Sequence, residues 1–248
     1  MSNGYIIYEG KSLLDNKPIV AIATVDSSNK KTGSMVQTWI LRSDIDPVTA
    51  SRTGEDYSIC GNCPHRGVAS NKETGQALDR TCYVNLIFAP NNIYKSYKRG
   101  IYQDARTHKQ TRSIGLLRGV RLGSYGDPMA VPKYIWDSLT CSSEYVTAYT
   151  HQANTMPQYV MTSADNLQQA ESAWSRKERT FRVISSIDKL VKGKEILCPA
   201  SDEYKELYNK PKRTCATCKL CGGNSVKGKS VAIVAHGTSK RKAKDLVE

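Results

Sequence analysis

Short apolar runs alternate with polar, glycine-rich stretches along most of the chain. Runs of this length that are rich in β-branched residues and bounded by turn residues are typical of buried strands. The clearest are Ile19–Val25 and Met35–Leu41. The same pattern predicts strands over 84–88, 116–123, 144–149, 159–162, 179–184, 195–197 and 230–235. The chain is therefore expected to be built on many short strands.

Helices are predicted between several of these strands. Asn91–Arg99 is a helical segment that ends at a glycine, and Pro132–Leu139 has proline in its first turn. Asn166–Lys177 follows Asp165, a residue type that caps helices. Residues 44–82 carry scattered glycines and prolines instead, and they predict a long irregular loop.

The alternation of strand, polar strand end and helix is the pattern of parallel α/β sheets. Roughly six to eight such units favour a small or incomplete TIM-like (β/α)8 barrel, with a doubly wound open sheet as the alternative. We expect one domain over residues 1–238 and a solvated basic tail over 239–248. Both folds gather ligands at the carboxyl ends of their strands, which is where the polar clusters of this chain fall.

The charge balance changes the picture of possible partners. The 248 residues include 36 Lys and Arg against 23 Asp and Glu, a net charge of +13. Such an excess favours a polyanionic partner, because contacts to phosphates release counterions. The alternative is a basic protein with no such partner. No apolar run is long enough for a membrane span, and the first residues lack the features of a secretory signal, so a cytoplasmic protein without a membrane partner is expected.

Cysteines close to one another in the last fifth of the chain predict a metal site. Cys215, Cys218 and Cys221 have spacings of two residues, and Cys198 precedes them. Four thiolates suit a tetrahedral, structural zinc ion that keeps no open position. We expect the zinc-binding segment to span 198–236. An iron–sulfur cluster is the alternative, because this spacing also begins the bacterial ferredoxin run.

A second group of possible ligands lies in the predicted loop. Cys60, Cys63, His65 and Cys82 match no single zinc signature, so the sequence leaves two interpretations open: a second metal site, or thiols that pack beneath the loop.

Carboxylates at predicted strand ends are candidate catalytic groups. Asp127 lies between glycine and proline, where little side-chain bulk obstructs a substrate, although such an aspartate also suits a simple turn. Asp56 is the second candidate, since two carboxyl groups with different pKa values can divide the nucleophilic and proton-transfer roles. The candidate substrate-binding residues at the same strand ends are Arg121, Tyr125, His151, Gln152, Ser163 and Asp165.

Basic residues and tyrosines alternate between positions 94 and 121. Cations bind phosphates, and tyrosine rings stack on unpaired bases, so this stretch is a candidate nucleic-acid surface rather than only a solvated face. The candidates are Tyr94, Lys95, Lys98, Arg99, Arg106, Lys109 and Arg112.

Five motifs together resemble the tRNA-guanine transglycosylase superfamily, and within it the phage branch that places 7-deazaguanine bases in DNA. They are Cys60-Gly-Asn-Cys-Pro-His-Arg, Thr81-Cys-Tyr, Arg121-Leu-Gly-Ser-Tyr-Gly-Asp-Pro, Tyr149-Thr-His-Gln and the late Cys/His block, and they extend over roughly 35–237. The resemblance implies a TIM-like barrel, a late structural zinc and base exchange at a glycosidic bond. The chain departs from the tRNA enzymes in its C-x2-C-x2-C spacing, its lack of their Asp-Ser-Gly-Gly loop and its shorter length.

The expected function is exchange of guanine in DNA for a free 7-deazaguanine base. Asp127 is expected to attack the deoxyribose C1′, Asp56 to donate and accept protons, and the target base to leave the base stack. DNA and the base are the expected partners, and a phage-encoded protein would act in the host cytoplasm. The alternatives are an iron–sulfur enzyme similar to the radical-SAM class and a zinc protein that binds nucleic acid without catalysis.

Overall fold

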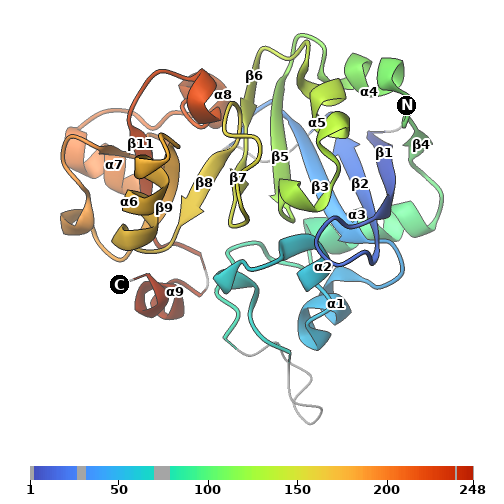
Figure 1. The fold of residues 1–248 in the computed structure, drawn as a ribbon, viewed down its shortest axis with the longest axis horizontal. Coiled ribbons are helices and arrows are strands. Elements are labelled where there is room, and N and C mark those ends of the chain that lie inside the picture. The colour runs from blue at the N-terminus through green and yellow to red at the C-terminus, as the bar shows by residue number, and fades with distance from the viewer. Residues whose placement is uncertain (1–2, 27–31, 70–78, 238, 248) are drawn as a thin grey trace.

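The computed structural model describes residues 3–26, 32–69, 79–237 and 239–247. It is a mixed α/β protein in which two sheets lie side by side and helices surround them (Figure 1). The first sheet has the strand order β4-β1-β2-β3-β5-β6, and the second has the order β10-β11-β9-β8-β7.

The first sheet combines both strand directions. β1, β2 and β3 pair antiparallel, whereas β5 and β6 continue the sheet parallel to β3, and β4 pairs parallel with β1. β2 lies between two neighbours and is buried at every position after its first residue, which explains its uninterrupted apolar sequence. The bounds are β1 (Gly4–Lys11), β2 (Pro18–Thr24), β3 (Val36–Arg42), β4 (Gln103–Asp104), β5 (Gly119–Tyr125) and β6 (Tyr145–Thr147).

The second sheet is parallel throughout. Met161, Val231 and Ile233 pack with two cysteines on one face, and a separate apolar cluster, which includes Ile184 and Leu197, covers the other. Its strands are β7 (Tyr149–Thr150), β8 (Met161–Ala164), β9 (Thr180–Ile184), β10 (Glu195–Leu197) and β11 (Ser230–Val234).

One residue, Ala148, connects the two sheets. It lies between β6, which pairs with β5, and β7, which pairs with β8. Its N–H donates to the carbonyl oxygen of Cys221 at 3.4 Å, and its own carbonyl oxygen accepts from Met161 N–H at 2.9 Å. The cysteine-rich segment is therefore hydrogen-bonded to the junction of the sheets.

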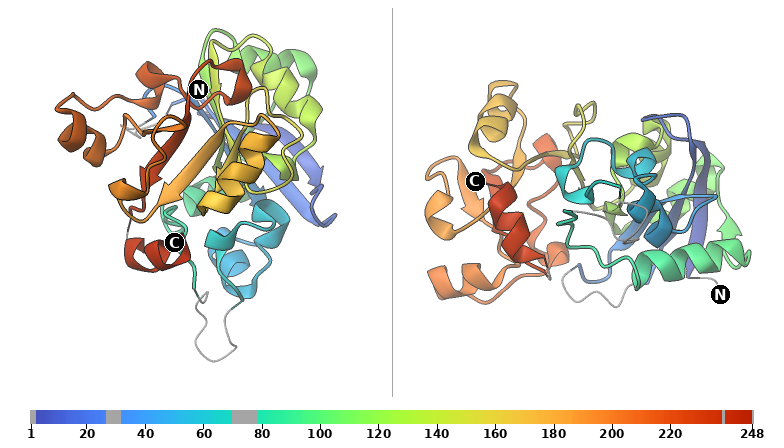
Figure 2. Two further views of the ribbon diagram at one scale, coloured as in Figure 1. Left: turned by 60° about the vertical axis from the view of Figure 1, so that its left-hand side comes forward. Right: turned by 90° about the horizontal axis from the view of Figure 1, so that it is seen from below.

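The helices gather at different ends of the sheets. Figure 1 shows α1, α2 and α3 below the first sheet and α4 at its upper end, and the view from below in Figure 2 shows the first three together. The helices are α1 (Pro47–Thr53), α2 (Tyr57–Cys60), α3 (Ala89–Lys98), α4 (His108–Gly115), α5 (Lys133–Thr140), α6 (Leu167–Ser175), α7 (Asp202–Tyr208), α8 (Cys215–Cys218) and α9 (Lys240–Leu246).

Three of the expected elements differ from the structure. Residues 84–88 form a turn that leads into α3, because Pro90 begins a helix there and Ile87 and Phe88 are exposed. The expected loop 44–82 contains α1 and α2; the Asp46 carboxylate accepts from the N–H groups of Val48 and Thr49 at the start of α1.

The end of the chain also differs from the expectation. The stretch 239–248 was expected to be a solvated tail, but Lys240–Leu246 forms α9. Ala243 and Val247 of this segment are each 4% exposed, so their burial holds the helix against the rest of the protein.

Candidate functional site

The carboxyl ends of β5, β7 and β8 bring together side chains from distant parts of the sequence. Asp127 follows β5, His151 follows β7, and Asp165 follows β8. The segment after β3 adds Asp56 at the start of α2 and His65 in the 3₁₀ turn Pro64–Arg66. Parallel strands end at one edge of a sheet, which is why these groups meet.

Asp127 is buried and accepts four hydrogen bonds. Its Oδ1 accepts from Met129 N–H at 2.9 Å and from the Thr150 hydroxyl at 2.8 Å. Its Oδ2 accepts from His151 N–H at 2.9 Å and from Gln152 Nε2 at 3.3 Å. Burial raises the pKa of Asp127, while these donors act in the opposite direction. The carboxylate thus fixes the chain just after β7.

Gln152 covers this carboxylate. Besides its bond to Asp127, Nε2 donates to the carbonyl oxygen of Cys60 at 3.1 Å, and Oε1 accepts from Asn62 N–H at 3.2 Å. The left-handed Gly61 allows this close approach, because a Cβ there would lie 2.4 Å from Gln152 Oε1. The Gln152 amide therefore connects the end of α2 to the end of β7.

Asp56 is the second buried carboxyl group of this region. It is 1% exposed, and Arg66 Nη1 donates to its Oδ1 at 2.7 Å. Burial raises the pKa of Asp56 to about 6, although the Arg66 guanidinium opposes the shift. Asp56 and Asp127 both lie near Cys60: the Cys60 N–H donates to the Asp56 carbonyl oxygen at 2.9 Å, and Gln152 Nε2 donates both to the Cys60 carbonyl oxygen and to Asp127 Oδ2. Burial and the charges of these two carboxylates raise the pKa of the Cys60 thiol. A carboxyl group that titrates near neutral pH can exchange protons with a substrate.

Asp165 lies between two imidazoles. His65 Nε2 is 2.9 Å from its Oδ1, and His151 Nε2 is 3.3 Å from its Oδ2. Burial alone would raise the pKa of Asp165, but the hydrogen bonds of His151 and His65 outweigh it and hold that pKa well below the usual range. Asp165 was expected to cap α6, but the cap is Asn166, whose side chain accepts from Gln169 N–H.

The thiols of the second cysteine group lie around the same cluster. Burial raises the pKa of Cys82, and the neighbouring Cys63 adds to the rise. The hydroxyl of Tyr125 is buried and has no hydrogen-bond partner among the described residues. Tyr125, a predicted substrate-binding residue, therefore lies inside the protein near these thiols, where burial raises the pKa of its hydroxyl.

Two other predicted substrate-binding residues lie within strands rather than at their ends. Arg121, in β5, donates to the hydroxyl of Tyr83 at 2.9 Å, and its guanidinium is 5.7 Å from the centroid of the Tyr149 ring. Ser163, in β8, pairs with Phe181. These residues lie within the strands, whereas His151, Gln152 and Asp165 lie at the strand ends.

The four late cysteines converge beside the second sheet. Cys198 follows β10, Cys215 and Cys218 are the ends of α8, and Cys221 is buried against Met161 and Val231. Burial raises the pKa of Cys221 to about 12, and the charges of the other three thiols contribute. The four thiols lie in one region, but no three of their sulfur atoms lie within 4.8 Å of one another, so a tetrahedral zinc ion at about 2.3 Å from each sulfur would require these segments to move closer together. His236 is not among them; its ring stacks on Tyr83 with centroids 5.5 Å apart.

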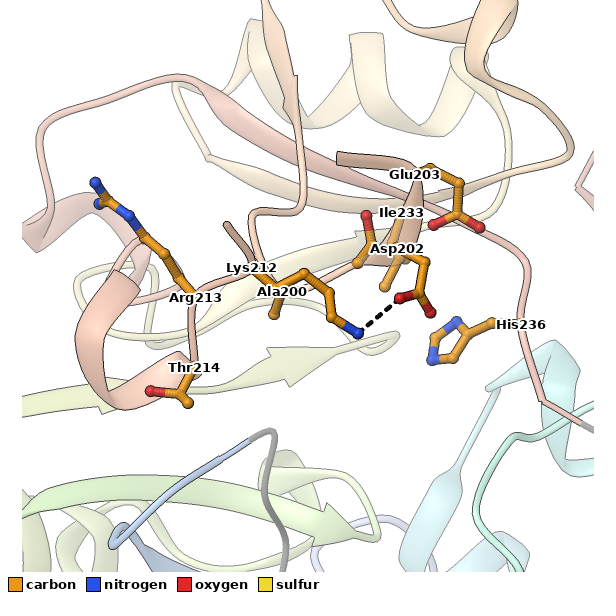
Figure 3. Close-up of a pocket in the computed structure, with 9 residues that line it drawn as sticks. Ala200, Asp202, Glu203, Lys212, Arg213, Thr214, Ile233 and His236 are labelled. Atoms are coloured by element: carbon orange, nitrogen blue, oxygen red, sulfur yellow. Dashed lines mark hydrogen bonds and ion pairs between the residues drawn. The ribbon is translucent and has the colours of Figure 1, made fainter. Parts of the chain in front are cut away.

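A cavity of about 480 Å³ lies near the end of β11 (Figure 3). The Lys212 side chain extends across it to Asp202, with Lys212 Nζ 2.6 Å from Asp202 Oδ1. His236 lies beside this ion pair (Figure 3). The cavity is lined by Ala200, Ser201, Asp202, Glu203, Lys212, Arg213, Thr214, Ile233 and His236. None of the candidate catalytic residues lines it.

The predicted nucleic-acid surface is divided between two ends of the protein. Tyr94, Lys95, Lys98 and Arg99 line a hollow of about 420 Å³ along α3. Tyr94 is itself buried in the core, so its ring is not exposed for stacking. Lys109 and Arg112 lie on α4 at the opposite end of the first sheet (Figure 1). Arg106 instead pairs with Glu9 at 3.5 Å, and the other carboxylate oxygen of Glu9 accepts from the hydroxyl of Tyr97 on α3.

Sequence reasoning missed Arg66, Thr81 and Thr150. Thr81 Oγ1 is 2.7 Å from His65 Nδ1, and Thr150 binds Asp127. Only their positions beside His65, Cys82 and His151 in the sequence hinted at these contacts.

No family model, curated protein or solved structure matches the chain. Among the described residues, no helix is both long enough and apolar enough to cross a membrane. The candidate site is therefore interpreted from its own residues.

Proposed function

We propose that this protein is a base-exchange glycosyltransferase that replaces guanine in DNA with a 7-deazaguanine base, and that its reaction centre is at the carboxyl ends of β5 and β7. The observation that carries the proposal is a pair of buried carboxyl groups near Cys60. Asp56 has a pKa of about 6, and Asp127 is held by four donors. Two carboxyl groups in different environments are what such chemistry needs.

The reaction has two balanced steps. Asp127 Oδ2 forms a bond to the deoxyribose C1′ as the bond from C1′ to guanine N9 breaks, and protonated Asp56 gives its proton to the departing base. The 7-deazaguanine then transfers a proton to Asp56, and its ring nitrogen attacks C1′ and releases Asp127. The sugar is returned with its original configuration, because it is inverted twice.

Substrate access requires that Gln152 moves. Its hydrogen bond to Asp127 Oδ2, at 3.3 Å, is the longest of the four, so we expect it to be the weakest and the first to break when a substrate approaches. When Gln152 turns away, Oδ2 keeps one donor, the His151 N–H, and is open to the substrate, while Thr150 and Met129 still hold Oδ1. The rest of the network therefore keeps the nucleophile oriented.

The arrangement of strands and charges supports the same proposal. The parallel strands β3, β5 and β6 of the first sheet and β7, β8 and β9 of the second follow one another in chain order, the order that the TIM-like barrel of the resemblance would have, although β6 and β7 belong to different sheets. The exposed Lys95, Lys98 and Arg99 lie on α3, near α1 and α2, and would bind the backbone of a strand with an extruded base. A zinc ion at the four late cysteines would be structural.

The test is exchange on DNA that carries labelled guanine. Wild-type protein with free 7-deazaguanine should release the label, and rapid denaturation should trap a protein–DNA adduct at Asp127. Asp127→Asn should abolish release and adduct but keep DNA binding. Asp137→Asn, a change at a half-exposed carboxylate on α5, is the matched control and should leave both unchanged.

DNA binding without release of label by the wild-type protein would contradict the proposal and would leave a polyanion-binding protein. Because Asp127→Asn also removes structural hydrogen bonds, Gln152→Ala provides a second test. It should retain exchange, since the alanine uncovers Oδ2 and leaves the nucleophile in place.

A further inference from the structure

His65, His151 and Asp165 form the most compact group of potential metal ligands in the described residues. One ligand atom from each lies within 4.8 Å of the others, and the remaining described His, Cys, Asp and Glu form no group of three that meets this limit. The three residues come from the 3₁₀ turn after α2, the end of β7 and the end of β8. Their side chains are 12%, 20% and 5% exposed, so the group is largely shielded from water.

The separations match those of ligands around one ion. Asp165 Oδ1 is 2.9 Å from His65 Nε2 and 3.4 Å from His151 Nε2. Two ligands that are each about 2.1 Å from an ion, at tetrahedral or octahedral angles, lie roughly 3.0–3.4 Å apart. An ion would therefore require little movement of these side chains.

The surroundings also orient the imidazoles for metal binding. His65 Nδ1 is 2.7 Å from the hydroxyl of the buried Thr81, which leaves Nε2 to face Asp165. A histidine ligand commonly binds such a partner through its second ring nitrogen. The Cys63 side chain also lies beside His151 and places sulfur next to the group. Imidazole and nearby sulfur favour transition metals over magnesium or calcium.

We propose that His65, His151 and Asp165 bind one divalent transition-metal ion, such as zinc, iron or cobalt. Three protein ligands leave at least one position for water or a substrate atom, as in catalytic rather than structural sites. This site is separate from the four late cysteines, and the inference does not depend on the proposed glycosyl transfer. The alternative is a hydrogen-bonded His–Asp–His network that needs no ion.

The experiment is a Co²⁺ titration of the full-length protein after removal of metal. The expected result is one binding event with weak visible bands, without intense near-ultraviolet thiolate absorption, and distinct from any event at the late cysteines. Asp165→Asn and His65→Gln should remove this event. Cys215→Ser should keep it, and Cys141→Ser, at an exposed thiol outside both groups, should leave all binding unchanged.

A second measurement uses only the wild-type protein, in case the variants fail to fold. With Co²⁺ bound, the proton NMR spectrum should contain hyperfine-shifted N–H signals from two imidazoles that disappear in heavy water. Their absence would overturn the proposal. Equal Co²⁺ binding by wild-type protein and by folded Asp165→Asn and His65→Gln variants would also overturn it.

Discussion

The two groups of candidate metal ligands differ in how the chain builds them. Cys215, Cys218 and Cys221 lie within one short segment, and only Cys198 is brought from elsewhere. His65, His151 and Asp165 are far apart in sequence and meet only because parallel strands end at the same edge. The cysteine group can organise its own segment, whereas the His/Asp group depends on the complete fold.

Their surroundings differ in the same way. The cysteine segment is hydrogen-bonded to the junction of the sheets through the Cys221 carbonyl oxygen, and it packs on apolar side chains. The strand-end region instead holds the buried acids Asp56, Asp127 and Asp165, and burying charge costs free energy. The first region is therefore held mainly by apolar packing, whereas the second depends on the hydrogen bonds and ion pairs that offset the burial of its carboxylates.

The largest effect is expected at the cysteine group. Cys221→Ser should lower the free energy of unfolding by several kcal/mol, because structural zinc binding, worth on the order of 10 kcal/mol, is coupled to folding. Thermal unfolding with and without a chelator measures the loss, and the chelator should destabilise the wild type but not the variant. Cys141→Ser is the matched control. If both variants unfold like the wild type, the late cysteines are not a structural metal site.

A smaller effect with a definite pH dependence is expected at Asp56. Its pKa is about 6 in the folded protein against an ordinary 3.8. Between these values the folded state binds more protons than the unfolded chain, so the free energy of unfolding falls as pH rises from about 4 to about 6. A shift of about two units corresponds to about 3 kcal/mol at most.

Asp56→Asn removes this titration. Chemical denaturation at pH 4 and pH 7 should therefore show that the wild type loses more stability than the variant over this range. The Asp137→Asn variant, whose carboxylate is half-exposed, should follow the wild type. Identical curves for Asp56→Asn and the wild type would mean that the Asp56 carboxyl group is not held in the buried environment described above.

The difference between local and long-range contacts also explains which elements the sequence could predict. Apolar runs predicted β2, β3 and β11, and the glycine and proline signals predicted α3 and α5, all to within two residues of their ends. The strand predicted over 116–123 is β5, but it begins only at Gly119, because Leu116 and Leu117 are exposed. The strand predicted over 84–88 was wrong, since apolar Ile87 and Phe88 are exposed in a turn, and no local pattern encodes that. The helix α1 was missed although Asp46, Pro47 and Gly54 are ordinary signals for its start and end.

The site was predictable where its residues follow strands. His151, Asp127 and Asp165 were selected from polar strand ends, and these strand ends do converge. Their partners were not predictable: Thr81 binds His65, Arg66 binds Asp56, and Gln152 covers Asp127. These contacts join segments whose relative positions depend on tertiary packing, which spacing in one sequence does not contain.

A further prediction concerns the orientation of the proposed metal ligands. Thr81→Val keeps the shape of the side chain but removes the hydroxyl that binds His65 Nδ1. Co²⁺ affinity of the His/Asp group should fall roughly 10- to 100-fold, as is common when a partner of a histidine ligand is lost. Thr81→Ser retains the hydroxyl and should bind nearly as the wild type. Equal affinity of both variants would show that Thr81 does not orient the ligand.

The smallest expected effect is on the salt dependence of DNA binding, and it distinguishes α3 from α4 as the helix that contacts DNA. If DNA approaches the strand-end region, the nearby α3 should carry the phosphate contacts, whereas α4 lies at the far end (Figure 1). Replacing Lys95 and Lys98 with alanine should reduce the slope of log K against log salt by about two, since each lost phosphate contact contributes about 0.9. Replacing Lys109 and Arg112 is a charge-matched control and should leave the slope unchanged. The opposite result would place DNA at α4, at the other end of the first sheet from Asp127 and Asp56, and would contradict the proposed reaction centre.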